Sequence, residues 1–317
     1  MRAGGPEVLE LVRLEAPTPG PGAILVRNEA IGVNYIDTYH RSGLYPVPLP
    51  CVLGLEAAGV VASVGEGVTR FREGDRVAYA SGPLGAYAES HVVLEGRAVA
   101  LPSDVGFDLA AAVLLKGMTA EFLLRRCYAV QAGEAVLVHA AAGGVGSLLT
   151  QWAKRLGARV IGTVGSEAKA ELARSQGCDE VILYGEEDVA KRVRALTDGA
   201  GVRVAYDGVG AATFEGTLAS LGRRGAFVSY GNASGPPPAL EIGRLARMGS
   251  LSLTRPTLGD YVATDSELDS SAASLFEVLR TGAVRMSIGQ TYRLEEARQA
   301  HMDLEGRRTI GASLLRP

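Results

Sequence analysis

The sequence predicts an α/β protein in which a mostly β domain is interrupted by a parallel sheet covered with helices. Three observations support this fold class. Up to about residue 115, apolar and polar residues alternate at strand period between turns rich in glycine and proline. From 135 to 253, short apolar runs alternate with segments of helical period, which indicates a parallel sheet covered on both faces. A glycine-rich turn joins the first of these runs to the first helix.

The first domain is expected to be a small, irregular antiparallel barrel. Its predicted strands span 24–30, 57–64, 76–80 and 86–93. Three prolines exclude helix from 45–50, and we interpret the polar and aromatic segment 34–45 as a loop. Two helices, at 110–115 and 119–124, are expected to be broken near Lys116-Gly117, where we place a domain boundary.

The second domain is expected to alternate strictly between strand and helix. Its predicted strands span 135–138, 159–163, 180–184, 202–206, 226–230 and 251–253. The helices between them are expected to follow the glycine turn and to span 167–176, 187–197 and 213–221. After 256, helices at 267–279 and 294–305 and a strand at 310–315 return to the first domain. The predicted domains are therefore 1–116 plus 257–317, and 117–256.

The glycine turn follows a buried strand and precedes an amphipathic helix. It reads Ala141-x-Gly143-x-x-Gly146, with alanine in the first place of the usual G-x-G-x-x-G. A helix N-terminus exposes unpaired N–H groups, so a phosphate can bind there without a charged side chain. Glycines allow the backbone to approach a pyrophosphate and the helix to pack closely on its strand. The sequence therefore predicts dinucleotide binding, against the alternative of a crossover that binds nothing.

Composition restricts the class of protein. A formal net charge of -3 and the lack of a basic, aromatic-rich patch argue against nucleic acid or an anionic membrane as a partner. The three cysteines are far apart and show no disulfide pattern, which favours a reducing, cytoplasmic location. No apolar run reaches the ~20 residues that a membrane span needs.

The end of the second parallel strand indicates which nicotinamide cofactor binds. Enzymes that use NAD usually carry an acid there, but this strand ends in Gly165-Ser166. Ser166 suits a helix N-cap, and Lys169 stands where a capping box would place Glu or Gln. A cation in the first helical turn interacts unfavourably with the helix dipole, at a cost of about 0.3–1 kcal/mol. A ribose 2′-phosphate would offset that cost, so we predict NADPH, with a solvated surface lysine as the alternative.

The motif Ala141-Ala142-Gly143-Gly144-x-Gly146 with Gln151 and Lys154 resembles that of quinone oxidoreductases of the zeta-crystallin type. These belong to the medium-chain dehydrogenase/reductase superfamily. Similar motifs at 32–39, 41–45, 74–77, 116–117 and 231–235 extend the resemblance through nearly the whole chain. The family has an extra strand before the Gly4-Gly5-Pro6 segment, so either the barrel edge is reduced or the true start lies upstream.

The resemblance implies a Rossmann domain inserted into a GroES-like barrel, a homodimer, and NADPH-linked reduction of quinones. It also implies a set of cofactor contacts on both domains. These are Asn34, Tyr39, Thr119, Ala142, Gly143, Gly144, Val145, Gly146, Gly165, Ser166, Lys169, Tyr184, Tyr230, Gly231, Asn232, Arg255 and Arg307.

The chain is not expected to hold catalytic zinc. Where zinc relatives carry a thiolate and a histidine ligand, this chain has Asn34 and Leu55, and no cysteine lies between 75 and 91. His40, His91, His139 and His301 show no ligand spacing and are interpreted as surface or packed residues.

Hydride transfer needs alignment and stabilisation of charge on the quinone oxygen. The 34–45 segment offers the amide of Asn34, the phenols of Tyr39 and Tyr45, and the cation of Arg41. We predict that Asn34 and Tyr39 orient the nicotinamide and the substrate oxygen, and that Tyr45 lines the quinone slot. Tyrosines that merely pack the loop are the alternative.

Two other functions stay open at this point. The same cofactor could reduce the double bond of an alkenal or enone, which only a substrate panel would distinguish. A protein of another class, structural or RNA-binding like a crystallin, would bind NADPH without consuming it. A homodimer could form by pairing of edge strands near 251–253 across a two-fold axis.

Overall fold

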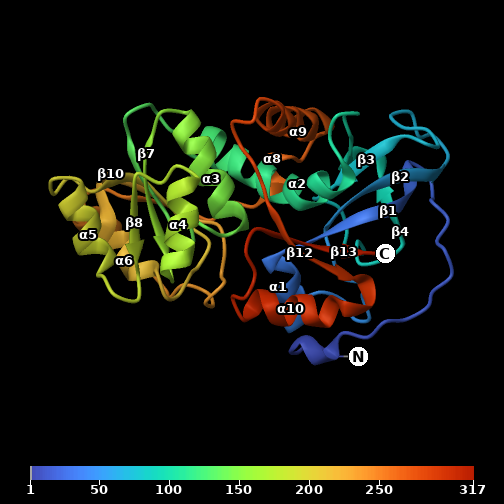
Figure 1. Ribbon diagram of the computed structural model, residues 1–317, viewed down its shortest axis with the longest axis horizontal. Coiled ribbons are helices and arrows are strands. Elements are labelled where there is room, and N and C mark those ends of the chain that lie inside the picture. The colour runs from blue at the N-terminus through green and yellow to red at the C-terminus, as the bar shows by residue number, and fades with distance from the viewer. Residues whose placement is uncertain (1) are drawn as a thin grey trace. The chain divides into compact units, whose positions relative to one another are not determined.

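The computed structural model describes residues 2–317, and its contacts divide the chain into two compact units (Figure 1). Unit 1 comprises the described residues up to Met118 together with Tyr261–Glu277 and Met286–Pro317. Unit 2 comprises Thr119–Asp260 and Val278–Arg285. Residues 278–285, which the sequence analysis assigned to the first domain, therefore group with unit 2.

Unit 1 is built on a seven-stranded sheet in the order β12-β13-β1-β2-β3-β5, with β4 also paired to β1. The strands are β1 Ala23–Val33, β2 Glu56–Val64, β3 Arg76–Tyr79, β4 Ser90–Leu94, β5 Ala98–Ala100, β12 Ile288–Arg293 and β13 Ala312–Arg316. All pairs are antiparallel except β12 with β13. Ile24, Val26 and Val61 lie in its core and are almost completely buried. The mostly β first domain is confirmed.

The segment 34–45 is not a loop, as predicted, but contains helix α1 (Tyr35–Ser42). Asn34 occupies the N-cap position, and its backbone N–H donates to Asp37 Oδ2 at 2.8 Å. Gly43, with φ of +83°, ends the helix in the left-handed conformation. The prolines that follow end the helix but do not prevent it, because its eight residues are complete before the first of them.

The predicted break at Lys116-Gly117 is also wrong. Helix α2 runs without interruption over Phe107–Phe122 and continues as a π-helical turn, Leu123–Cys127. Gly117 is present for packing, because a Cβ there would lie 2.4 Å from Cδ1 of Leu275. Leu275 belongs to helix α9 (Asp265–Arg280).

The strand predicted at 86–93 begins only at Ser90. The side-chain amide of Asn28 donates to the carbonyl oxygens of Ala86 and Ala88, at 3.2 and 2.8 Å. These carbonyls are therefore satisfied by a side chain instead of a strand neighbour.

Unit 2 is an all-parallel sheet of six strands in the order β11-β10-β9-β6-β7-β8. The strands are β6 Ala135–Val138, β7 Arg159–Val164, β8 Glu180–Leu183, β9 Val202–Asp207, β10 Leu221–Ser229 and β11 Ser252–Thr254. Its helices are α3 Gly144–Arg155, α4 Glu167–Ser175, α5 Val189–Leu196, α6 Phe214–Ser220 and α7 Ile242–Arg247. Figure 1 shows α3, α4, α5 and α6 beside the sheet. The predicted Rossmann-type sheet is confirmed.

The strand order reverses beside β6. The chain passes from β6 outward to β7 and β8, then returns to β9 on the other side of β6. Ligands of doubly wound sheets bind at the carboxyl ends of the strands where the order reverses. The end of β6 is therefore the place to examine for a ligand site.

The remaining elements are short or follow unit 2 in the chain. They are α8 Leu258–Tyr261, α10 Ala297–Glu305 and the 3-10 turns Pro6–Val8, Glu95–Arg97 and Leu294–Glu296. Strands β5 and β12 and helices α7 and α8 were not predicted from the sequence. Within residues 2–317, no helix combines the length and the apolar character needed to cross a membrane.

Candidate functional site

The turn after β6 is built from backbone. Gly143 is the N-cap of α3, and no side chain within residues 2–317 forms a capping hydrogen bond there. The turn is held instead by Gly143 N–H to the carbonyl of Ala140 and Ser147 N–H to that of Gly143, both at 2.8 Å. The first-turn N–H groups and the positive end of the helix dipole are thus available to an anion.

The glycines of this turn have different roles. A Cβ on Gly146 would lie 2.2 Å from the carbonyl oxygen of Ala140, which is backbone and cannot move aside cheaply. A Cβ on Gly143 would lie 3.0 Å from the same atom and 3.8 Å from Ala140 Cβ. Gly146 is therefore required by the close packing of α3 on the turn, whereas at Gly143 the contact of a Cβ with the same backbone oxygen would be tight but less severe.

The ends of β7 and β8 bring together four predicted cofactor residues. Ser166 is the N-cap of α4, with no capping bond from its side chain, and Lys169 is the third helical residue. Gly165 follows β7, and a Cβ there would lie 2.3 Å from the hydroxyl of Tyr184, which follows β8. Glu167 pairs with Arg174 at 2.6 Å.

The ends of β9 and β10 approach each other just as closely. A Cβ on Gly231 would lie 2.4 Å from the carbonyl oxygen of Gly208, and Tyr230 covers Gly208 from the side. Arg255, after β11, donates to the carbonyls of Ser229 and Gly231 at 2.9 and 3.2 Å. Arg255 therefore braces the Tyr230–Asn232 segment, where Asn232 is buried.

On unit 1, the predicted substrate-side residues form two groups. Tyr39 packs against Tyr35 and Tyr45, with ring centroids 5.7 and 5.1 Å apart. Tyr39 is buried, and Tyr45 is partly exposed. Asn34 points elsewhere, because its side-chain amide donates to Oε2 of Glu56 at 2.8 Å.

Glu56 is the centre of a cluster that the prediction missed. Its side chain is fully buried, and its Oε2 also accepts from the ammonium of Lys116 at 3.1 Å. Its Oε1 accepts from the backbone N–H of Leu115 at 2.7 Å. Two charged residues inside apolar segments, Gly54-Leu55-Glu56 and Leu114-Leu115-Lys116, were the sequence signal for this pair.

Arg41 was predicted to present its cation to the substrate, and the structure corrects this. Its side chain is buried, and both Nη atoms donate to the carboxylate of Glu305, at 3.0 and 2.7 Å. Nε donates to the carbonyl of Gly4, and Nη1 lies 3.1 Å from Nδ1 of His301. Sequence spacing gave no sign of these partners, which lie up to 264 residues away.

A chain of hydrogen bonds leads from Arg41 to Asp37. Because an arginine can only donate, Nδ1 of His301 accepts, and the neutral ring carries its proton on Nε2. Nε2 then donates to Tyr87 at 3.0 Å, and the Tyr87 hydroxyl donates to Asp37 Oδ2 at 3.0 Å. The same Asp37 oxygen caps α1 through Asn34.

Burial shifts the pKa values of Asp37 and His301 in the directions that favour their uncharged forms. Loss of hydration raises the pKa of Asp37 to about 7, although bonds from Asn34 and Tyr87 oppose the rise. Loss of hydration, with help from the charge of Arg41, lowers the pKa of His301 to about 3. At neutral pH, His301 is therefore uncharged.

The remaining predicted positions fall outside these groups. Thr119 is buried in α2, and Arg307 follows α10 with a φ of +57°. His139 is buried between Thr163 and Thr217, at 3.0 and 2.9 Å. In the described part of the chain, three or more His, Cys, Asp or Glu side chains nowhere gather as metal ligands would.

Two family models match the chain and correspond to its two kinds of sheet. The alcohol dehydrogenase GroES-like domain matches residues 20–124, and the zinc-binding dehydrogenase family matches 144–309. Together with the parallel sheet and its glycine turn, these matches define a two-domain protein of the medium-chain dehydrogenase/reductase superfamily.

Similar sequences and solved structures identify the family within this superfamily. A quinone oxidoreductase of Pseudomonas aeruginosa is 53% identical over 315 residues, which cover 99% of this chain and 97% of the relative. The quinone oxidoreductase of Pseudomonas syringae pv. Tomato superposes with a TM-score of 0.98 at 53% identity, covering 100% and 98% of the two chains. That of Escherichia coli, solved with NADPH, gives 0.98 at 47% identity and the same coverage. The chain belongs to the quinone oxidoreductase family.

Proposed function

We propose that this enzyme reduces quinones with NADPH and that no metal takes part in the chemical step. The observation that carries the proposal is the carboxyl edge of the unit 2 sheet. There the backbone-built turn after β6 adjoins a strand end that offers Ser166 and Lys169 in place of an acid. The full-length relatives named above are quinone oxidoreductases, which supports the same reaction.

The cofactor's anionic groups have two matching places on unit 2. The N–H groups of 144–146 would hold the pyrophosphate, because they stand at the N-terminus of α3 with no capping side chain among the described residues. Ser166 and Lys169 would hold the 2′-phosphate, and Tyr184 adjoins them across Gly165. When bound, NADPH supplies a hydride equivalent. The Escherichia coli relative solved with NADPH supports this choice.

On unit 1, Asn34, Tyr39 and Tyr45 remain our proposal for the residues that orient the reactants. Tyr39 and Tyr45 form an aromatic edge that suits a flat acceptor. Asn34 is held in position by Glu56 and by the start of α1. Arg41 is left out of this set, because Glu305 and His301 engage its guanidinium.

Steady-state oxidation of NADPH with 1,4-benzoquinone and naphthoquinones tests the proposal directly. We expect turnover with NADPH, much less with NADH, and no loss of rate after treatment with a zinc chelator. Asn34→Ala and Tyr39→Phe should each lower quinone turnover while the far-UV spectrum stays unchanged. Full turnover by both variants would remove these two residues from the proposal.

A second candidate function is reduction of a polarised carbon–carbon double bond. A 2-haloacrylate reductase of a Burkholderia species is 43% identical over 324 residues, with 100% of this chain and 97% of the relative covered. A solved structure of a 2-haloacrylate reductase superposes with a TM-score of 0.90. A panel of alkenals, enones and haloacrylates beside the quinones distinguishes the two, because both reactions consume NADPH.

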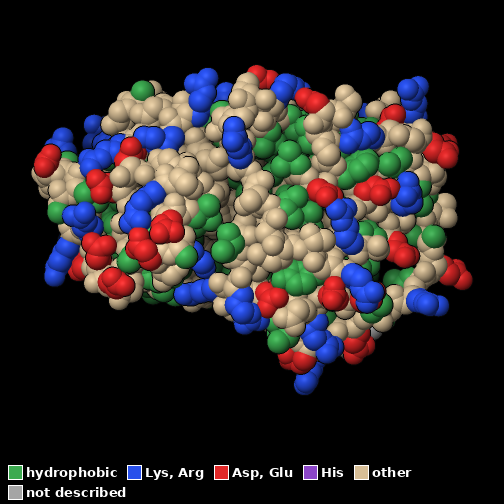
Figure 2. Space-filling model, viewed as in Figure 1, with side chains coloured by type: hydrophobic (Ala, Val, Ile, Leu, Met, Phe, Trp, Pro, Cys, Tyr) green, Lys and Arg blue, Asp and Glu red, His purple; other side chains and the backbone are tan. Residues whose placement is uncertain are grey.

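A structural or RNA-binding role is the remaining alternative. On the face drawn in Figure 2, acidic and basic side chains are interspersed, as the net charge of -3 also suggests. RNA binding in contrast favours a continuous basic groove. Tight binding of NADPH without its oxidation by any acceptor would favour this alternative.

We further propose a homodimer formed through the edge of the unit 2 sheet. Strand β11 lies at that edge, and Ser252, Leu253 and Thr254 are all exposed. An exposed edge strand is a template for pairing, and a two-fold axis would continue the sheet into a second copy. Sedimentation at micromolar concentration tests this, since a monomer alone would contradict it.

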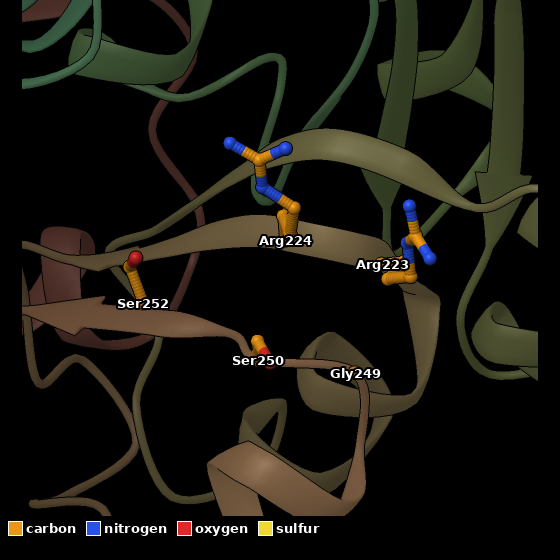
Figure 3. Close-up of a pocket in the computed structure, with 5 residues that line it drawn as sticks. All are labelled: Arg223, Arg224, Gly249, Ser250 and Ser252. Carbon is orange, nitrogen blue, oxygen red and sulfur yellow. The ribbon is translucent and has the colours of Figure 1, made fainter.

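A pocket borders the same edge (Figure 3). It is lined by Arg223, Arg224, Gly249, Ser250 and Ser252. In Figure 3 the guanidinium groups of both arginines point away from Ser250, so these side chains do not converge on one anion. This pocket is therefore assigned no ligand, and a second copy is the proposed neighbour of this edge.

A cytoplasmic location is also part of the proposal. Cys51, Cys127 and Cys178 are all free thiols, and Cys51 is exposed. Exposed free thiols persist in a reducing compartment. Fractionation of cells that produce the protein would test this location.

A further inference from the structure

The ammonium group of Lys116 is buried in unit 1 and shares the Glu56 carboxylate with Asn34. Quinone reduction places negative charge on the acceptor, and a buried ammonium group can stabilise that charge. We propose that Lys116 is a catalytic residue that donates a hydrogen bond to the acceptor's oxygen as negative charge develops on it. The inference rests on the proposed quinone reduction and adds a residue to it.

Lys116 is buried and makes few contacts with hydrogen-bond acceptors. Its side chain is 7% exposed, and its Nζ makes one hydrogen bond to the described residues, the 3.1 Å bond to Glu56. An ammonium has three hydrogens and no lone pair, so two donor directions are not used by residues 2–317. Burial of a charged donor is costly unless its hydrogens find acceptors. An oxygen of the substrate supplies such an acceptor during turnover.

Glu56 is arranged to hold this ammonium in position. Its carboxylate accepts three donors, from Leu115, Asn34 and Lys116, at 2.7, 2.8 and 3.1 Å. Three donors from three different positions fix the plane of the carboxylate. Gly32 makes room for it, because a Cβ there would lie 2.4 Å from Glu56 Oε2. The pair is therefore neutral as a whole and rigid, which is what a preorganised donor requires.

The other cation nearby cannot take this role. Arg41 is engaged by Glu305 and His301, as described above. Tyr39 and Tyr45 offer neutral phenols, which stabilise an anion less than an ammonium does in a buried site. Lys116 also shares the Glu56 carboxylate with Asn34, so a ligand oxygen near Asn34 is also near Lys116.

The step balances without any further reagent. Two electrons and one proton equivalent pass from NADPH to the quinone, which breaks one C–H bond of the cofactor and leaves NADP+. The reduced acceptor then bears one negative oxygen, which Lys116 stabilises as an ammonium throughout. Solvent supplies the second proton on release of the hydroquinone.

A double-mutant cycle tests the inference. Lys116→Met removes the ammonium but leaves Glu56 charged, and this variant alone could lose stability for that reason. Lys116→Met with Glu56→Gln restores neutrality and keeps one acceptor oxygen, for either Asn34 or the N–H of Leu115. We expect the double variant to regain most of the melting temperature lost by Lys116→Met and the NADPH affinity of the wild type. Its kcat with quinones should still be lower by about a hundredfold, the usual cost of one oxyanion donor.

Recovery of kcat in the double variant would overturn the inference, since Lys116 would then only neutralise Glu56. Lys191→Met is the matched control, because that side chain is 85% exposed on α5 and pairs only weakly with Asp188. It should behave as the wild type in every measurement.

A second measurement does not depend on turnover. 4-Nitrophenol is a flat phenol whose ionised form is yellow, so absorbance reports the charge of the bound molecule. We expect the wild type to bind it mainly as the phenolate and the double variant mainly as the neutral phenol. Equal ionisation in both proteins, or no binding by either, would overturn the inference. Failure of quinone turnover in the wild type would instead contradict the proposed function and leave this result interpretable.

Discussion

The two units use different kinds of groups to hold negative charge. In unit 2, the turn around Gly143 and Gly146 uses backbone N–H groups and a helix end, with no capping side chain among the described residues. In unit 1, the cluster around Glu56 uses paired side-chain charges inside the core. Both arrangements need a glycine beside them, Gly146 in the turn and Gly32 beside Glu56, but only the cluster in unit 1 depends on the charges of side chains.

The largest expected effect concerns the titratable side chains of unit 1. The pKa of Asp37 is raised to about 7 from 3.8, so its contribution to stability is present below pH 4 and is lost as pH rises to 7. The pKa of His301 is lowered to about 3 from 6.5, so its contribution is lost as pH falls through that range. The two contributions oppose each other between pH 4 and 6.5.

Single variants should separate these contributions. Relative to the wild type, Asp37→Asn should gain stability as pH rises from 4 to 6.5, and His301→Gln should lose it. Each slope should approach about 1.4 kcal/mol per pH unit. Urea unfolding at several pH values measures the free energy of unfolding of the wild type and the two variants. The same pH dependence in all three proteins would show that burial does not shift the pKa values of Asp37 and His301.

The next effect concerns added methyl groups in the glycine turn. Gly146→Ala should lower the free energy of unfolding by about 1–3 kcal/mol, because its Cβ meets the backbone of Ala140 at 2.2 Å. Gly143→Ala should cost less, because its Cβ meets the same backbone oxygen at 3.0 Å, but it should weaken NADPH binding by obstructing the helix N-terminus. Thermal unfolding and fluorescence titration with NADPH distinguish them. If both variants lost stability equally, the different roles assigned to these glycines would be wrong.

A smaller effect is expected at the proposed 2′-phosphate site. Lys169→Ala should raise the KM for NADPH roughly tenfold and leave that for NADH unchanged, the loss of one charge-assisted hydrogen bond. Lys191→Ala is again the exposed control. An unchanged preference between the cofactors would refute the role of Lys169.

The smallest effect compares two helix N-caps of unit 2. The Asp188 carboxylate accepts from the N–H of Lys191 at 3.1 Å, so Asp188→Ala should cost about 1 kcal/mol of stability. Ser166 makes no capping bond, so Ser166→Ala should cost only a few tenths. Thermal unfolding without cofactor measures both, and equal losses would mean that the Ser166 hydroxyl does cap α4.

The difference between the glycine turn of unit 2 and the side-chain cluster of unit 1 explains which features could be predicted from the sequence. The parallel sheet was predictable, because strands buried on both faces are short apolar runs and the turns between them need glycine. Helix α1 was missed because three of its four buried residues, Asp37, Thr38 and Arg41, are polar. Its capping pair, Asn34 with Asp37 three residues later, was a local signal that the interpretation as a loop did not use. Arg41 was misassigned for a related reason, since its partner Glu305 is distant in sequence.

The Glu56–Lys116 pair also could not be predicted from the sequence. Periodicity identifies which face of an element is buried when its residues are apolar, but a charged residue in such a position is normally assigned to the surface. Only the fold shows that the start of β2 and the middle of α2 bring these two charges together. The backbone-built site was found from sequence because its glycines are themselves the signal.

The pairing of β13 with β1 has a consequence for the order in which the chain is made. Val33 lies opposite Ser313 and Ile31 opposite Leu315, so the first sheet closes only with residues that follow all of unit 2. During synthesis on the ribosome, residues 31–33 of β1 therefore lack their β13 partner while the parallel sheet emerges, although Ala23–Arg27 can already pair with β4. Variants that slow the folding of unit 2 should leave that strand accessible for longer, and a greater need for chaperones during translation would reveal it.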